Sequence, residues 1–160
     1  AVSLAKEGKI AEAIKEAEWG MGGLKELDRE ARKNLFPEKL AGFGGQDFSD
    51  QSAMGVTVIE RIYSKGNKDI KVSLTEIGGS NNPLAGMAAL GQMFGQTSNQ
   101  IRLSGRVNGS KNVQGNRVEI TASVQNQMLS ISSSTASEEE VVGVAKEFPI
   151  EAFQAYYSGN

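Results

Sequence analysis

The sequence predicts an α+β domain in which an antiparallel sheet of about six strands is flanked by helices. Before residue 36, apolar residues recur at alternating steps of four and three, which is typical of a helix with one apolar face. Between residues 53 and 134, apolar and polar residues alternate, as in strands that bury one face. A further helical pattern follows the last of these strands.

The composition is that of one globular domain: 160 residues, of which 39% are hydrophobic and 22% charged. A formal net charge of -2 provides no general attraction to nucleic acid or to an anionic membrane. No apolar run approaches the roughly 20 residues that a membrane-spanning helix needs. We therefore expect no nucleic-acid partner and no membrane span.

The chain contains no histidine and no cysteine. This composition excludes Ser-His and Cys-His catalysis, thiolate metal sites and disulfides. Carboxylates, lysine, tyrosine and serine remain, and no motif arranges them as a catalytic group. The prediction is a protein that is not an enzyme and has no catalytic residues, no metal and no cofactor.

Residues 1–35 are expected to form an N-terminal helix that packs on the domain. Its apolar stripe consists of Ile10, Ile14, Ala17, Met21 and Leu24, and the pattern continues through Leu27 and Ala31. Three glycines inside the stripe cost about 1 kcal/mol each relative to alanine. Two interpretations remain open for them, a kink and a close approach of another backbone: Gly20, Gly22 and Gly23.

Pro37 ends the helix, because the residue before a proline avoids the helical region. Residues 36–52 are rich in Gly, Ser and Asp and are expected to be a connector. Residues 53–160 form the predicted α+β sandwich domain.

Six strands are expected within that domain. The first two span 54–63 and 70–77, and the next two span 101–107 and 110–114 with a turn at Asn108-Gly109. Two more strands place Ile120 and Ile131 on the inner face. The first hairpin is basic, and we interpret its charges as solvated surface rather than an anion site: Arg61, Lys65, Lys68 and Lys71.

Residues 84–94 are expected to form a helix that is apolar nearly all round, after an N-cap at Asn82 and a proline at Pro83. Two interpretations are open for it. It is either a buried crossover helix or a methionine-rich surface that binds a partner. The candidate partner-binding residues are Leu84, Met87, Leu90, Met93 and Phe94.

Ser137 and Glu140 have the spacing of a capping box and predict the start of a helix. Val144 and Phe148 lie on its apolar face, and Pro149 begins a short terminal helix. The acidic first turn, Glu138 to Glu140, is explained by the helix dipole rather than by a metal site.

In several features the chain resembles a group of uncharacterised exported bacterial proteins with a PsbP-like α/β/α sandwich domain. The resemblance is carried by Pro37 followed by Gly42-Phe43, by the strand end at Tyr63 and by the run into Ser137-Glu138-Glu139. It implies a periplasmic or otherwise exported protein with a non-catalytic role. It assigns no site residues.

The leading functional hypothesis is therefore a cell-envelope accessory protein that binds another protein through the 84–94 helix and the neighbouring sheet surface. The alternative is a small-molecule or lipid carrier, with an apolar pocket between the sheet and that helix.

Overall fold

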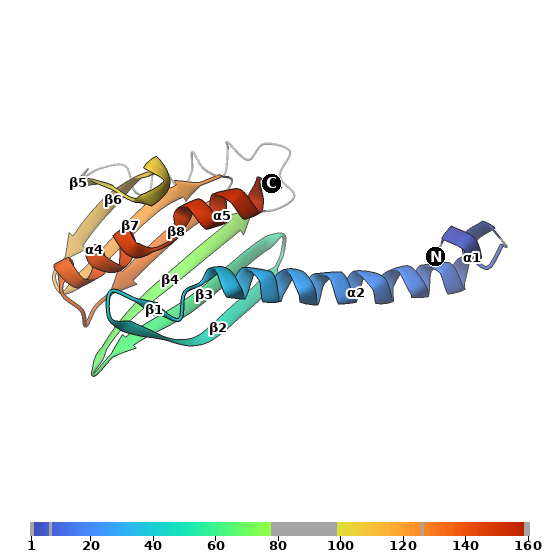
Figure 1. The fold of residues 1–160 in the computed structure, drawn as a ribbon, viewed down its shortest axis with the longest axis horizontal. Helices are drawn as coiled ribbons and strands as arrows, with labels where there is room; N and C mark the ends of the chain where they lie inside the picture. The colour runs from blue at the N-terminus through green and yellow to red at the C-terminus, as the bar shows by residue number, and fades with distance from the viewer. Residues whose placement is uncertain (1, 7, 78–98, 126, 159–160) are drawn as a thin grey trace. The chain divides into compact units, whose positions relative to one another are not determined.

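The computed structural model describes residues 2–6, 8–77, 99–125 and 127–158. The chain divides into two compact units, Ala1–Asn34 and Leu35–Asn160. Figure 1 labels the elements of both units.

The first unit is helical, as predicted. Helix α1 (Val2–Lys6) is separated from helix α2 (Ile10–Leu35) by Gly8, which has a φ of 77°. Helix α2 continues through the glycines at 20, 22 and 23. Its apolar stripe is more than half exposed at Ile10, Ile14, Met21, Leu24 and Leu27. The packing of this helix on the domain stays a prediction.

The second unit contains an antiparallel sheet of eight strands in the order β1-β2-β3-β4-β8-β7-β6-β5. The predicted α+β class is confirmed, but the prediction of six strands was wrong. The strands are β1 (Lys39–Leu40), β2 (Phe43–Ala53), β3 (Val56–Lys65), β4 (Lys68–Ile77), β5 (Asn99–Arg102), β6 (Asn108–Gln114), β7 (Arg117–Val124) and β8 (Gln127–Ser133).

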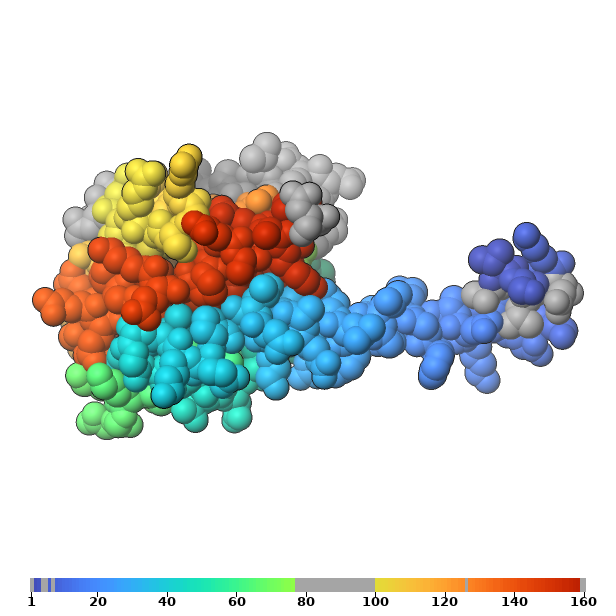
Figure 2. Space-filling view, viewed as in Figure 1, coloured from blue at the N-terminus to red at the C-terminus, as the bar shows by residue number. Residues whose placement is uncertain are grey.

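Helices α4 (Glu138–Glu147) and α5 (Ile150–Tyr157) pack against one face of this sheet, and their atoms form a layer in front of it (Figures 1 and 2). Helix α4 contacts β1 at one edge, and α5 contacts the 3-10 turn η1 (Ser104–Arg106) near the other, so the sheet curls around the helices. The covered face carries alternate strand residues that are at most 4% exposed: Ile70, Val72, Leu74, Val118, Ile120, Leu129 and Ile131.

The two additional strands come from the segment predicted to be a connector. Residues 43–53 form β2, which pairs with β3 from Gly44↔Ser64 to Ala53↔Val56. The segment lacks apolar alternation because only Phe43 and Phe48 reach the core. Phe43 is buried, and the Phe48 ring packs edge-on against Phe36 with 5.4 Å between ring centroids.

Arg61 is not part of the solvated surface, contrary to the prediction for the basic hairpin. Its side chain lies on the covered face of β3 and is 5% exposed. The guanidinium donates hydrogen bonds to the Gln46 carbonyl at 3.0 Å, the Phe36 carbonyl at 3.1 Å and the Glu38 carboxylate at 3.1 Å. These acceptors explain how a cation is tolerated inside the fold.

Tyr63 lies beside Arg61 and is fully buried. Its hydroxyl donates a hydrogen bond to the Pro37 carbonyl at 2.9 Å. Burial is the main cause that raises the pKa of Tyr63 to about 12. Arg61 and Tyr63 together hold the segment that follows α2 against the sheet.

The predicted turn at Asn108-Gly109 was wrong. Strands β5 and β6 are joined instead through η1, where Gly105 and Arg106 have φ values of 66° and 59°. Gly109 is buried inside β6, and a Cβ there would lie 3.1 Å from the Leu103 side chain and 3.2 Å from the Thr121 carbonyl oxygen. The glycine is required by close packing rather than by a turn.

The predicted capping box at the start of α4 is confirmed. The Ser137 hydroxyl accepts a hydrogen bond from the Glu140 amide at 3.2 Å, and the Ser137 amide donates to the Glu140 carboxylate at 3.1 Å. Val144 and Phe148 behind it are fully buried, as their spacing predicts.

Candidate functional site

The sequence predicted a set of partner-binding residues, and all of them lie outside the part of the chain that the structure describes: Leu84, Met87, Leu90, Met93 and Phe94. The two interpretations of that helix, and the apolar pocket of the carrier hypothesis, therefore stay predictions. The described residues offer a different candidate site.

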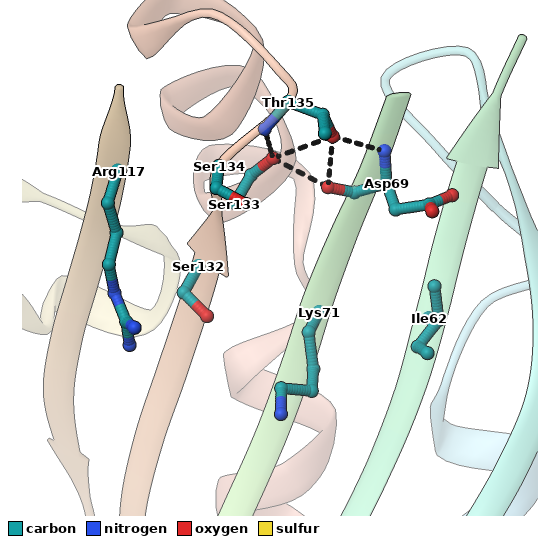
Figure 3. Close-up of a pocket in the computed structure, with 8 residues that line it drawn as sticks. All are labelled: Ile62, Asp69, Lys71, Arg117, Ser132, Ser133, Ser134 and Thr135. Atoms are coloured by element: carbon teal, nitrogen blue, oxygen red, sulfur yellow. Dashed lines mark hydrogen bonds between the residues drawn. The ribbon is translucent and has the colours of Figure 1, made fainter. Parts of the chain in front are cut away.

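This site is a groove of about 330 Å³ on the face of the sheet opposite to α4 and α5 (Figure 3). It crosses β3, β4, β8 and β7 and includes the short segment that follows β8. Its lining residues among those described are Ile62, Asp69, Lys71, Arg117, Ser132, Ser133, Ser134 and Thr135.

The register of the sheet creates the floor of the groove. Ile62 pairs with Lys71, and Lys71 pairs with Ser132. Ser132 in turn pairs with Glu119 on β7. Because residues directly opposite one another in an antiparallel pair point to the same face, these side chains form one row across four strands. Arg117 lies two residues before Glu119 and so shares this face.

A network of hydroxyl groups fixes one end of the groove. The buried Ser133 hydroxyl donates to the Asp69 carbonyl at 2.6 Å and accepts from the Ala136 amide at 2.9 Å. The Thr135 hydroxyl accepts from the Asp69 amide at 2.9 Å. These groups tie the end of β8 to the start of β4 (Figure 3), and we assign them a structural role.

Lys71 and Arg117 lie on either side of Ser132, and their side chains run in the same direction along the sheet (Figure 3). A Glu60 carboxylate oxygen lies 3.9 Å from the Lys71 ammonium. A Glu119 carboxylate oxygen lies 3.7 Å from the Arg117 guanidinium. Both distances exceed that of a hydrogen bond. An ammonium has three N–H donors and a guanidinium five, so both groups keep donors for a ligand.

The Ser132 hydroxyl makes no hydrogen bond to any other residue in the described part of the chain. The Asp69 carboxylate is occupied, since it accepts a hydrogen bond from the Ser64 hydroxyl at 2.5 Å. The described lining residues with donors available to a ligand therefore include Lys71, Ser132 and Arg117.

The polar surface continues toward β6. A second hollow of about 160 Å³ shares Arg117 with the groove and is lined by Asn112, Gln114, Arg117 and Glu119. Amide and carboxylate groups in this hollow extend the set of hydrogen-bonding partners available on this face.

The groove is lined by charged and hydroxyl side chains together with Ile62. No set of three or more His, Cys, Asp or Glu residues is placed to hold a metal ion in the described ranges. None of the helices that the structure describes is long and apolar enough to cross a membrane.

Sequence reasoning identified Lys71 only as one charge of a basic hairpin. The structure separates the four cations: Arg61 is buried, Lys65 lies 5.8 Å from the Phe43 ring centroid, and Lys68 donates to Glu140 at 2.8 Å. Ser132 and Arg117 were missed entirely. They join Lys71 only through the pairing of β4 with β8 and of β8 with β7, which no local pattern reveals.

No family model matches this chain, and the searches of curated proteins and of solved structures give no match either.

Proposed function

We propose that this chain is a non-catalytic accessory protein that binds another protein, and that the groove around Ser132 is its contact surface. One observation carries the proposal: Lys71, Ser132 and Arg117, on three neighbouring strands, present donors on the sheet face opposite α4 and α5. The groove combines positive and negative groups and hydroxyls with an exposed apolar residue, Ile62, which is 40% exposed. This mixture suits the contact surface of another protein.

The setting that we propose is the cell envelope. A chain without cysteine suits an oxidising compartment, and the resemblance to exported proteins with a PsbP-like domain favours the same place. PsbP-like domains generally act as accessory modules of larger assemblies, which agrees with a binding role. Fractionation of the native cells tests this part, because recovery in the cytoplasm would contradict it.

The test of the binding role is photocrosslinking in intact cells. A photoreactive residue at Ser132 reports on the groove, and the same residue at the exposed Lys146 of α4 serves as the control. We expect one dominant protein adduct from position 132 that is absent from position 146, identified by mass spectrometry.

Two outcomes would overturn the proposal. Identical adducts from both positions, or no protein adduct from position 132, would show that the groove is ordinary solvated surface. A lipid or metabolite adduct at 132, in place of a protein, would show that the groove binds a small molecule instead.

A further inference from the structure

The positions of Lys71 and Arg117 define what the groove can recognise. Strands β4, β8 and β7 are consecutive neighbours in the sheet, so the two strands that carry the cations are about 10 Å apart with β8 between them. Ser132 pairs with Lys71 on one side, and on the other with Glu119, two residues from Arg117. Both side chains are long and flexible. An acceptor placed above the Ser132 hydroxyl is therefore within reach of both.

We propose that the groove binds a carboxylate of a partner peptide, with Lys71 and Arg117 on its two sides and the Ser132 hydroxyl donating to it. This inference rests on the proposed function and specifies its chemistry. Charge-assisted hydrogen bonds to a carboxylate are about 2.7–2.9 Å long. They are shorter than the 3.9 Å and 3.7 Å contacts that the two cations now make with Glu60 and Glu119.

The nearby carboxylates restrict the class of anion. Glu60 and Glu119 balance the charges of Lys71 and Arg117, and Asp69 adds a further carboxylate to the lining, so the site has no excess of positive charge to hold a polyanion. Nucleic acids and anionic membranes need several cations in excess. A single carboxylate adds one negative charge and obtains directed hydrogen bonds, which a site of this composition can provide.

Ile62 specifies a second part of the ligand. It pairs directly with Lys71 on β3, and its side chain is 40% exposed on the groove face. An apolar residue of the ligand, next to the bound carboxylate, would cover the Ile62 side chain. The recognised segment therefore carries an acidic residue beside an apolar one.

The first experiment measures binding of a blocked Glu-Leu dipeptide by NMR titration of the full chain, with Gln-Leu and phosphoserine-Leu dipeptides as comparison probes. We expect saturable shifts at Lys71, Ser132 and Arg117 with the Glu-Leu probe. Replacing either cation in Lys71→Gln or Arg117→Gln should weaken binding about tenfold, the effect of one hydrogen bond to a charged group. The matched control Lys65→Gln, on the same hairpin as Lys71, should bind as the unmodified chain does.

Equal binding of the Gln-Leu probe, or unchanged binding in both cation variants, would overturn the carboxylate assignment. Tighter binding of the phosphoserine probe would overturn it in favour of phosphate recognition. Because Lys71 and Arg117 are exposed, the variants should keep the melting temperature of the unmodified chain, which verifies that they fold.

Crosslinking from Ser132 in the Lys71→Gln/Arg117→Gln double variant separates this inference from the proposed function. Loss of the protein adduct supports both. An undiminished adduct leaves the protein-binding role standing and removes the role of the two cations. Probe binding without any protein adduct in the unmodified chain preserves carboxylate recognition and removes the proposed function.

Discussion

Arg61 is the residue whose environment depends most on the complete fold. Its guanidinium is held by three acceptors on two segments of the chain, at Phe36 and Glu38 after α2 and at Gln46 in β2. An unpaired cation at this depth would cost several kcal/mol, whereas a fully hydrogen-bonded one is tolerated. The bulge in β2 between Gly45 and Phe48 brings the Gln46 carbonyl into reach.

Gly45 is predicted to be essential for this arrangement. A Cβ at this position would lie 2.6 Å from the Arg61 Nε atom, and the guanidinium cannot move aside without losing its acceptors. Gly45→Ala should lower the free energy of unfolding by about 2 kcal/mol, a typical cost of overpacking. Urea denaturation measures the change.

Gly44→Ala is the matched control, because a Cβ there would meet only the Ser64 carbonyl oxygen at an ordinary 3.9 Å. Equal stability of the two variants would show that Arg61 rearranges at no cost.

The start of α4 shows how an element is fixed at its end. The capping box satisfies amides at the N-terminus of the helix. Glu140 also accepts a hydrogen bond from Lys68 at 2.8 Å, which links the helix to β4. The Lys68 bond, followed by the Ser137 backbone bond, lowers the pKa of Glu140 from 4.5 to about 2.

This lowered pKa predicts how stability depends on pH. Between pH 4.5 and 2 the unfolded chain binds a proton at Glu140 that the folded chain does not, so the contribution of this carboxylate is complete above pH 4.5 and is lost as the pH falls through 2. Glu140→Gln should therefore be less stable than the unmodified chain at neutral pH. The difference should shrink as the pH approaches 2, as measured by urea denaturation across this range.

Glu139→Gln removes the same charge from the same helical turn, and its exposed carboxylate makes no hydrogen bond to another residue of the described ranges. It should change stability less over this pH interval. A pH dependence as large as that of Glu140→Gln would mean that the helix dipole alone accounts for the effect.

At the scale of the whole molecule, the core cluster belongs entirely to the second unit. It runs from Phe36 to Phe153, and the Phe36 ring packs edge-on against Phe148 and Phe153 at centroid distances of 5.7 and 5.2 Å. The division between the units falls just before Leu35, so this aromatic anchor stays with the sheet.

We predict that a chain beginning at Leu35 folds cooperatively by itself. In that shortened chain Phe36→Ala should lower the free energy of unfolding by about 3–5 kcal/mol, the cost of an emptied aromatic site. Val113→Ala, where the valine is 43% exposed, is the control and should cost much less. Thermal unfolding followed by circular dichroism decides the matter: a shortened chain without a cooperative transition would show that the first unit is needed for folding.

The local patterns of the sequence were sufficient for most elements of the fold. Helix α2, strands β3 and β4, the inner positions Ile120 and Ile131 and the capping box at Ser137 follow from periodicity and spacing, and the structure confirms them. Each depends on interactions within a few residues along the chain, where side-chain period and capping chemistry act directly.

The tertiary structure alone decided β2, the burial of Arg61 and the groove. Strand β2 is stabilised by backbone pairing with β3, and its side chains show no alternating pattern that would predict a strand. Gly109 is required by close packing, although the Asn-Gly pair in the sequence indicates a turn. Lys71, Ser132 and Arg117 become neighbours because β8 inserts between β4 and β7. Pairings between strands far apart in the chain depend on how all the faces are buried together, and this is why no local pattern in the sequence predicts them.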